Sequence, residues 1–181
     1  GTIYVESKPG QGSCFEVLID LKIAKERPAF LSSKEEETPN GAILEGMHFL
    51  CAEDNELNAE ILTELLKMKG AECTICENGQ KVVETFEQSV PGAYDMILMD
   101  VQMPVMNGYD AARAIRRSLH KQAGTIPIIA MTANAFSEDI RHSLTAGMNA
   151  HISKPVDMML LEKTIRSIKS GGGSETQADK E

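Results

Sequence analysis

The sequence predicts an α/β domain in which an open parallel sheet is covered by helices on both faces. Short, mostly apolar runs of the kind that form buried parallel strands alternate with stretches that have the 3.6-residue period of helices. This rhythm occupies about 130 residues, from Ala42 to Lys169, which is enough chain for a stable core. Successive units of strand and helix are expected to cross over in the right-handed sense.

Each element follows from its own residues. The five apolar runs predict strands at residues 48–52, 71–76, 96–99, 126–131 and 150–153. Apolar stripes predict the intervening helices, and each stripe is expected to face the sheet. In chain order the stripes are Leu57, Ile61, Leu62, Leu65 and Met68; Val82, Val83 and Phe86; Ala111, Ala112, Ile115 and Leu119; Ile140 and Leu144; and Leu161, Ile165 and Ile168.

The segments outside this domain have a different character. Alternating apolar and polar residues on either side of a Gly/Pro turn predict a β-hairpin at residues 1–23. A lone two-stranded hairpin is marginally stable in water, so we expect this one to need a partner. Residues 24–45 are typical of a linker, residues 46–169 form the α/β domain, and residues 170–181 are typical of a flexible tail.

Composition narrows the possible functions. The net charge is −9, from 18 basic and 27 acidic residues, so we expect no nucleic-acid partner. No apolar run is long enough to span a membrane, so we expect no membrane contact by this chain. Four cysteines in a chain of this length do not suggest a disulfide framework and favour a cytoplasmic location.

Polar side chains follow the predicted strands, where open α/β sheets carry their functional groups. Glu53 and Asp54 follow the first strand, Asp100 the third, Thr132 the fourth and Lys154 the fifth. Three carboxylates at one edge repel one another, and a hard divalent cation such as Mg²⁺ (or Mn²⁺) relieves that repulsion. Together with the ammonium and the hydroxyl, they make a set of groups suited to phosphoryl transfer, for which an aspartate can be the nucleophile.

The motifs that carry these residues resemble a known family. The stretches A-E-D-N-E-L-N, D-M-I-L-M-D-V-Q-M-P-V-M-N-G, M-T-A-N-A and S-K-P are similar to those of receiver domains in two-component response regulators. The similarity covers residues 47–168 and is strongest to receivers attached to hybrid sensor histidine kinases. It implies a three-layer, flavodoxin-like (βα)5 fold with five parallel strands in the order 2-1-3-4-5.

The resemblance also implies roles for individual residues. Asp100 would be the phosphoacceptor, and Lys154 would bind the phosphoryl group. Asp54, Asp100 and the backbone carbonyl of Gln102 would bind Mg²⁺ directly, with Glu53 acting through water. The domain would take a phosphoryl group from a phosphohistidine, switch its signalling face, and slowly remove the phosphoryl group again.

Four further positions follow from the same resemblance. Thr132, with Ala133 beside it, would follow the phosphoryl group and move upon phosphorylation. His151 occupies the position of the family's rotating aromatic residue, where Tyr or Phe is commoner. The Lys154–Pro155 peptide bond would be cis, as it is in the family.

The N-terminal hairpin resembles the final strands of a histidine-kinase ATP-binding domain. We therefore expect a piece of a longer hybrid kinase that neither binds ATP nor has ATP-dependent kinase activity of its own. Its parent would be a histidine kinase with a cytoplasmic receiver. A membrane anchor elsewhere in the parent kinase is compatible with that location. The expected partner is a histidine phosphotransfer domain or the parent's phosphohistidine domain, docked on the first helix around Asn58 and Ile61.

Other interpretations remain open at this point. One is a receiver-like protein-interaction module that is never phosphorylated. A phosphohydrolase with an aspartate nucleophile would have an acid two residues after Asp100, where this chain has Gln102. A flavodoxin-like FMN carrier would have a phosphate-binding loop where Glu53 and Asp54 lie. A redox or zinc role for Cys73 and Cys76 is disfavoured, because residues three apart on a strand point to opposite faces.

Overall fold

The computed structural model describes residues 1–10, 12–19, 43–133 and 137–170. The chain divides into two compact units, Gly1–Asn40 and Gly41–Glu181, each of which is described here by itself. Most of the predicted linker at 24–45 and nearly all of the predicted tail at 170–181 lie outside the described residues.

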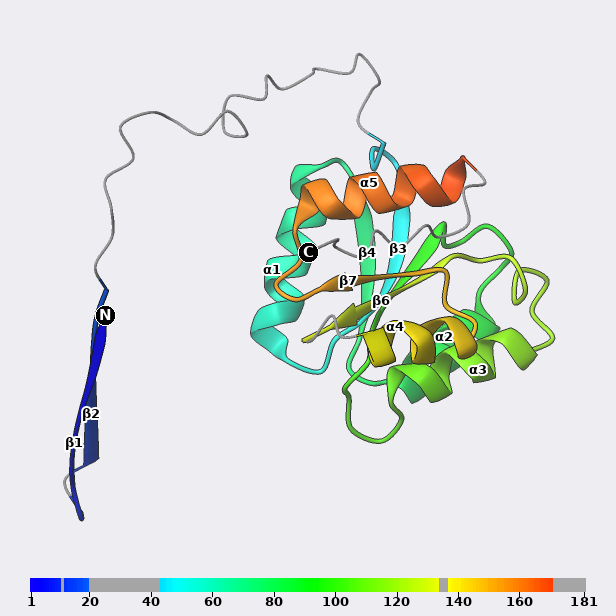
Figure 1. Ribbon diagram of the computed structural model, residues 1–181. Coiled ribbons are helices and arrows are strands. Elements are labelled where there is room, and N and C mark those ends of the chain that lie inside the picture. Colours follow the sequence, from blue (N-terminus) through cyan, green and yellow to red (C-terminus); the bar gives the residue numbers. More distant parts are fainter. Residues whose placement is uncertain (11, 20–42, 134–136, 171–181) are drawn as a thin grey trace. The chain divides into compact units, whose positions relative to one another are not determined.

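The second unit is built on a five-stranded sheet in which every neighbouring pair of strands is parallel (Figure 1). The strands are β3 (His48–Ala52), β4 (Glu72–Cys76), β5 (Met96–Asp100), β6 (Ile128–Thr132) and β7 (Ala150–Ser153). Their order is β4-β3-β5-β6-β7, which confirms the predicted order 2-1-3-4-5. The connections place β4 and β5 on opposite sides of β3, and open sheets with this change of direction bind ligands at their carboxyl edge.

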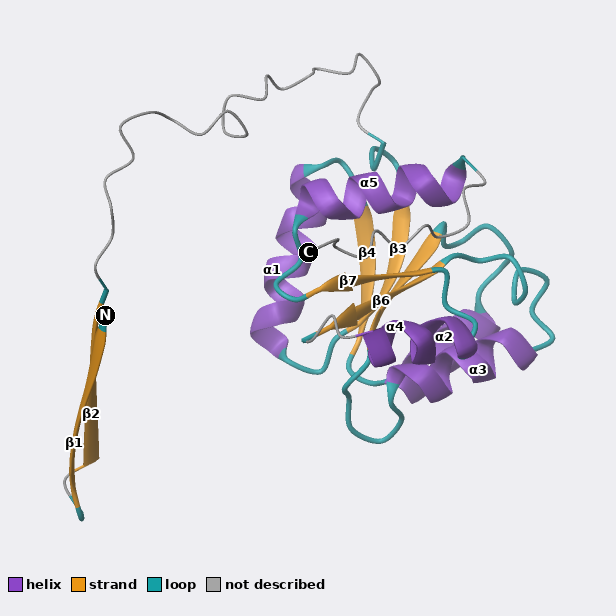
Figure 2. Ribbon diagram, in the orientation of Figure 1, coloured by secondary structure: helices purple, strands orange, loops and turns teal. Residues whose placement is uncertain are grey.

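Helices cover both faces of the sheet, as Figure 2 shows. They are α1 (Glu56–Met68), α2 (Gly79–Gln88), α3 (Gly108–Arg117), α4 (Ser137–Thr145) and α5 (Met158–Lys169). Helices α1 and α5 lie on one face, and α2, α3 and α4 on the other (Figure 2). Among the helices that the structure describes, none combines the length and apolar character that crossing a bilayer requires.

Two apolar cores form because alternate residues of a strand point to opposite faces. On β5, Ile97 and Met99 pack with residues of α2 and α3, whereas Met96 and Leu98 pack with residues of α1 and α5. All four side chains are buried, which explains why the central strands are continuous apolar runs.

Four helices begin at a side chain that accepts a hydrogen bond from the backbone of the first turn. Asn55, Asn78 and Asn107 each accept from the amide three residues later, and Asp157 accepts from Met159 and Leu160. Such caps satisfy amides that have no partner within the helix. The cap of α1 fixes the first helical residues directly after Glu53 and Asp54.

The predicted buried stripe of α1 is wrong in part. Leu62 is buried as expected, and Leu66 is the second buried residue of this helix. Leu57, Ile61 and Met68 are instead 63%, 51% and 80% exposed. The helix is rotated so that the 62/66 row faces the sheet, which leaves an apolar row on its outer side.

The N-terminal unit is an antiparallel hairpin of β1 (Thr2–Lys8) and β2 (Gly12–Leu18), which confirms the predicted pairing. Ile3 pairs with Val17 and Val5 with Phe15, so these four side chains share one face. All four are more than half exposed. The hairpin therefore presents an apolar face that its own residues do not cover.

Candidate functional site

The carboxyl ends of four strands bring the predicted polar residues together. Asp100 ends β5 and Thr132 ends β6, while Glu53 and Lys154 directly follow β3 and β7. Glu53 and Asp100 are only 4% and 5% exposed, and Asp54 is exposed. One carboxylate oxygen from each of these three acids lies within 4.8 Å of the others.

Lys154 joins two of the acids. Its ammonium nitrogen lies 2.6 Å from Asp100 Oδ2 and also donates a hydrogen bond to Glu53 Oε2. The backbone nitrogen of Lys154 donates to the carbonyl of Thr132 over 2.7 Å, and the following Lys154–Pro155 peptide bond is cis. The backbone hydrogen bond holds Lys154 at the sheet edge, and its side chain reaches the two carboxylates.

The loop after β5 holds the other oxygen of Asp100. The backbone N–H of Gln102 donates to Asp100 Oδ1 over 3.0 Å. The loop then turns back, and the N–H of Gly108 donates to the carbonyl of Val101. A Cβ atom on Gly108 would lie 2.2 Å from the Asp100 carbonyl oxygen, so this close approach requires glycine. The role predicted for the Gln102 carbonyl stays a prediction.

The sequence predicts Asn58 only as part of the docking surface for the phosphodonor. The structure shows in addition that Asn58 contacts Glu53. Its side-chain amide donates to Glu53 Oε1 over 3.0 Å, and the backbone N–H of Asn55 approaches the same oxygen at 3.4 Å. The signal in the sequence is the spacing D-N-x-x-N, in which Asn55 caps the helix and Asn58 lies one turn inside it. Glu53 is therefore held by Asn58 on one oxygen and by Lys154 on the other.

Burial and charge act in opposite directions on the two central groups. Burial raises the pKa of Asp100 above that of an ordinary aspartate, and hydrogen bonds from Lys154 and the Gln102 backbone oppose this only in part. Burial would lower the pKa of Lys154, but its bonds to Asp100 and Glu53 outweigh it, and the net pKa is raised. Lys154 is therefore a cation at neutral pH and supports the ionised form of Asp100.

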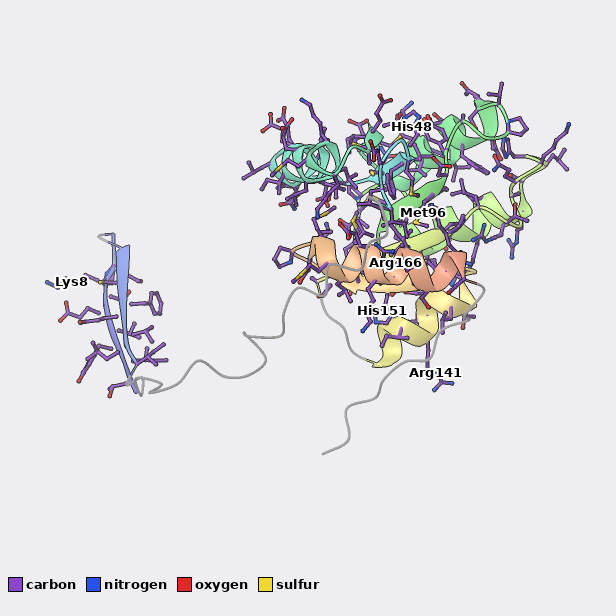
Figure 3. The ribbon with its side chains drawn as sticks, turned by 90° about the horizontal axis from the view of Figure 1, so that it is seen from above. Lys8, His48, Met96, Arg141, His151 and Arg166 are labelled. Atoms are coloured by element: carbon purple, nitrogen blue, oxygen red, sulfur yellow. The ribbon has the colours of Figure 1, made fainter. Side chains whose placement is uncertain are left out.

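Of the predicted switch residues, Thr132 ends β6 and its carbonyl accepts the hydrogen bond from the Lys154 N–H, whereas His151 lies within β7. Thr132 is buried and pairs in register with Ser153, and Ala133 is exposed at the start of the next loop. His151, labelled in Figure 3, is half-buried on β7 and pairs in register with Ala130. Burial lowers its pKa below the ordinary histidine value.

A cavity of about 310 Å³ lies beside the acids. Glu53, Asn58 and Lys154 contribute polar groups to its wall, whereas Ile61 and Leu65 of α1 contribute apolar side chains. The cavity thus connects Glu53 with the exposed Ile61 of α1.

Oxygen atoms from two buried acids and one exposed acid are suitable ligands for a hard divalent cation. Mg²⁺ prefers oxygen ligands, keeps several of its waters, and needs only one or two carboxylates. The exposed Asp54 leaves one side of the cluster open to water. The residues of this site therefore fit Mg²⁺ or Mn²⁺.

Cys73 and Cys76 pack against different cores, Cys73 on the α1 side and Cys76 on the α2 side. This arrangement rules out a joint site and agrees with the sequence argument. The sequence did not indicate that Cys73 would interact with Cys51 on the neighbouring strand. A hydrogen bond with Cys51 lowers the pKa of Cys73 to about 6, although burial acts in the opposite direction.

Comparison with known proteins gave consistent matches. Residues 49–166 match the model of the response regulator receiver domain. "Probable histidine kinase 2" of Oryza sativa subsp. indica is 34% identical over 148 residues. That alignment covers 76% of this chain but only 14% of the rice protein. The chain therefore spans a small part of this relative.

Two solved structures are similar across the second unit. The receiver domain of sensor histidine kinase PA1611 from Pseudomonas aeruginosa PAO1, with a magnesium ion coordinated in its active-site cleft, is 36% identical with a TM-score of 0.60. That match covers 68% of this chain and 98% of the other. The receiver domain of Ssk1 from Saccharomyces cerevisiae, crystallised with the histidine phosphotransfer protein Ypd1, is 30% identical with a TM-score of 0.61, and the match covers 72% and 93%.

Proposed function

The chain belongs to the family of response regulator receiver domains, and from this premise we propose that Asp100 accepts a phosphoryl group from a phosphohistidine. The observation that carries the proposal is the placement of the Asp100 carboxylate. It is buried beside two further acids, with Lys154 on one oxygen and the Gln102 N–H on the other. A carboxylate fixed in this way and paired with a cation is suited to in-line attack on phosphorus.

The chemical step is a transfer from nitrogen to oxygen. A carboxylate oxygen of Asp100 forms a bond to phosphorus as the bond between phosphorus and the donor imidazole nitrogen breaks. The electron pair of that bond returns to the imidazole. Lys154 lies beside the attacking carboxylate and balances the negative charge on the transferred oxygens. Hydrolysis later cleaves the new acyl phosphate with water, which yields inorganic phosphate and the free carboxylate.

Mg²⁺ is the proposed cofactor, and Mn²⁺ would be an alternative. Asp54, Asp100 and the carbonyl of Gln102 would hold the ion, with Glu53 acting through water. When bound, the ion would neutralise negative charge between the acids and the phosphoryl group. The oxygen-rich cluster supports this assignment, and so does the magnesium ion in the cleft of the Pseudomonas receiver domain.

We assign the switch to Thr132 and His151, with Ala133 next to Thr132. Thr132 ends β6 near the acids, and His151 lies on the neighbouring strand β7. Phosphorylation would favour one of two pre-existing arrangements of these residues and of the surface around α4, β7 and α5.

The outer row of α1 is the proposed docking surface for the phosphodonor. Leu57, Ile61 and Met68 are exposed there, and the cavity beside Ile61 leads to Glu53. The donor would be a histidine phosphotransfer domain or the phosphohistidine domain of the parent kinase. The complex of the similar Ssk1 receiver with Ypd1 supports the first of these.

The wider setting that we propose is a hybrid histidine kinase with its receiver in the cytoplasm. Residues 1–23 would contribute to the ATP-binding domain and residues 24–45 would link it to the receiver. The similarity to a rice histidine kinase supports this setting. Within the present chain we assign no ATP-dependent kinase activity, since the proposed chemistry needs only a phosphorylated donor.

The direct test is the intact mass of the protein after incubation with acetyl phosphate and Mg²⁺. The native chain should gain one phosphoryl group, about 80 Da, and a chelator should prevent the gain. Asp100→Asn should gain nothing, whereas Asp110→Asn, which changes an exposed aspartate on α3, should behave as native. If the folded native chain stays unmodified with acetyl phosphate and with a phosphorylated phosphotransfer protein, it is an interaction module instead.

A further inference from the structure

The contact between Asn58 and Glu53 is not explained by helix formation. Asn58 lies at the third position of α1, and its backbone N–H already donates to the cap residue Asn55 over 3.0 Å. Its side chain is therefore not needed for the cap. The side-chain amide instead reaches back beyond the cap and donates to Glu53 Oε1 over 3.0 Å.

The residue type also departs from the usual pattern at this position. In a capping box, the third helical residue is Glu or Gln, and its side chain returns to the backbone of the cap residue. A glutamate at position 58 would add a negative charge next to the buried carboxylate of Glu53. An asparagine costs some helix propensity but supplies a neutral hydrogen-bond donor in the same place. The asparagine at position 58 therefore favours the hydrogen bond to Glu53 at some cost in helix propensity.

The contact fixes which way the Glu53 carboxylate faces. With Oε1 bonded to Asn58, Oε2 is directed to Lys154, which also binds Asp100. Glu53 is buried, whereas Asn58 is exposed, and a donor to such an ionised carboxylate stabilises the charged form and limits rotation of the group. Asn58 thus orients Glu53, the acid that in the proposed function contacts the metal ion through a water molecule.

We propose that Asn58 is a positioning residue that holds Glu53 in the orientation needed for divalent-cation binding and so sets the affinity of the site for Mg²⁺. The proposal rests on the proposed function, because that function supplies the metal role of Glu53. Partners that orient metal-site groups from outside the first coordination sphere commonly change metal affinity by 10-fold to 100-fold when removed. We expect an effect near the lower end, because the Asn55 N–H remains near Glu53 Oε1.

The test compares three variants by calorimetric titration with MgCl₂. Asn58→Leu removes the amide, keeps the number and branching of the side-chain heavy atoms and keeps the backbone cap, and it should raise the Mg²⁺ Kd about tenfold. Asn58→Gln keeps an amide donor on a longer side chain and should recover at least half of that loss on a logarithmic scale. Glu60→Gln, at an exposed position of the same helix, removes a negative charge and should leave the Kd within twofold.

A rate measurement separates positioning from a general loss of structure. With acetyl phosphate as donor, which needs no docking on α1, the Mg²⁺ concentration for half-maximal rate should rise about tenfold in Asn58→Leu. The maximal rate should fall by a much smaller factor, and the thermal midpoint should fall by only a few degrees, as for the loss of one hydrogen bond. An unchanged Mg²⁺ Kd in Asn58→Leu, or an equal rise in Glu60→Gln, would overturn the proposal. Normal Mg²⁺ binding without phosphorylation of the native chain would instead count against the proposed function.

Discussion

The Lys154 ammonium lies 2.6 Å from Asp100 Oδ2, although the two residues are 54 positions apart in the sequence. The same ammonium also donates to Glu53. One cation therefore serves two buried carboxylates, and its removal would leave both acids without their positive partner. Breaking a buried ion pair by removing one partner is strongly destabilising, since an uncompensated charge remains in the interior.

Lys154→Met should therefore lower the stability of the domain when no divalent cation is present. We expect a loss of about 3 kcal/mol in the free energy of unfolding at neutral pH, measured by urea denaturation with a chelator. Adding Mg²⁺ should restore part of the loss, because an ion that binds the folded state stabilises it. Lys69→Met is the matched control. Its partner Glu162 is near the surface, so a loss under about 1 kcal/mol is expected, and equal losses would contradict the argument.

Asp100→Asn should have the opposite effect on stability. Because the pKa of Asp100 is raised in the folded protein, the ionised carboxylate destabilises the fold once the pH exceeds the aspartate pKa of the unfolded chain, about 3.9. This destabilisation reaches its full size once the pH exceeds the raised pKa of Asp100 in the folded protein. The variant should therefore be more stable than the native chain at neutral pH, since Lys154 keeps Glu53 as its partner, and the gain should disappear as the pH falls to about 4. Urea denaturation across this range, with a chelator, measures the difference.

The strands and the acid site were predictable because both depend on local patterns. Residues 150–153 were predicted as a strand and form β7 with the same bounds. Strand β6 was expected from residue 126 but begins at Ile128, after Pro127, which has no N–H for the ladder. The polar residues of the site directly follow apolar runs, so the fold class alone brings them to one edge of the sheet.

Features that depend on rotation or on neighbouring elements were not predictable in the same way. Period alone cannot tell whether Leu57 or Leu66 faces the sheet, because both lie on a broad apolar arc of α1. The contact of Cys51 with Cys73 depends on the register of two strands that are far apart in sequence. The hydrogen bond from Asn58 to Glu53 spans the cap of α1. The direction of the Asn58 side chain there determines its partner, and the sequence does not give that direction.

Ile61→Glu tests the proposed docking surface. A charge in the middle of the exposed apolar row should slow phosphoryl transfer from a phosphorylated histidine phosphotransfer protein about tenfold or more, as for loss of a central interface residue. Phosphorylation by acetyl phosphate should change by less than twofold, since that donor needs no docking. Both rates can be followed by intact mass.

The matched control for this variant is Leu119→Glu. Leu119 lies beyond the end of α3, where it was predicted to be buried, but it is fully exposed. The same chemical change there should leave both rates as in the native chain. Equal slowing with both donors in Ile61→Glu would show damage to the acid site and contradict a docking role.

Gly108→Ala should disrupt the loop that holds Asp100. The added Cβ would lie 2.2 Å from the Asp100 carbonyl oxygen and 2.9 Å from Met99 Cγ, so the backbone must shift. Overpacking of this kind commonly costs about 1–3 kcal/mol, and here it should also slow phosphorylation by acetyl phosphate. Gly124→Ala is the control, because a Cβ there has no neighbour within 4 Å. Denaturation and intact mass give the two readouts, and similar stability of the two variants would contradict the role of the close approach.

Cys73 should be the most readily alkylated thiol of the sheet. A hydrogen bond with Cys51 lowers its pKa to about 6 against the opposing effect of burial, with smaller contributions from Thr63 and the charge of His48. Burial instead raises the pKa of Cys51 and Cys76. Because the thiolate is the reactive form, iodoacetamide should modify Cys73 with a half-maximal rate near pH 6 and leave the other two largely unmodified at neutral pH. Peptide mapping by mass spectrometry, in a background that lacks the exposed cysteine of β2, measures each site separately. A rate for Cys73 that rises only above pH 8 would show that the contact with Cys51 does not stabilise its thiolate.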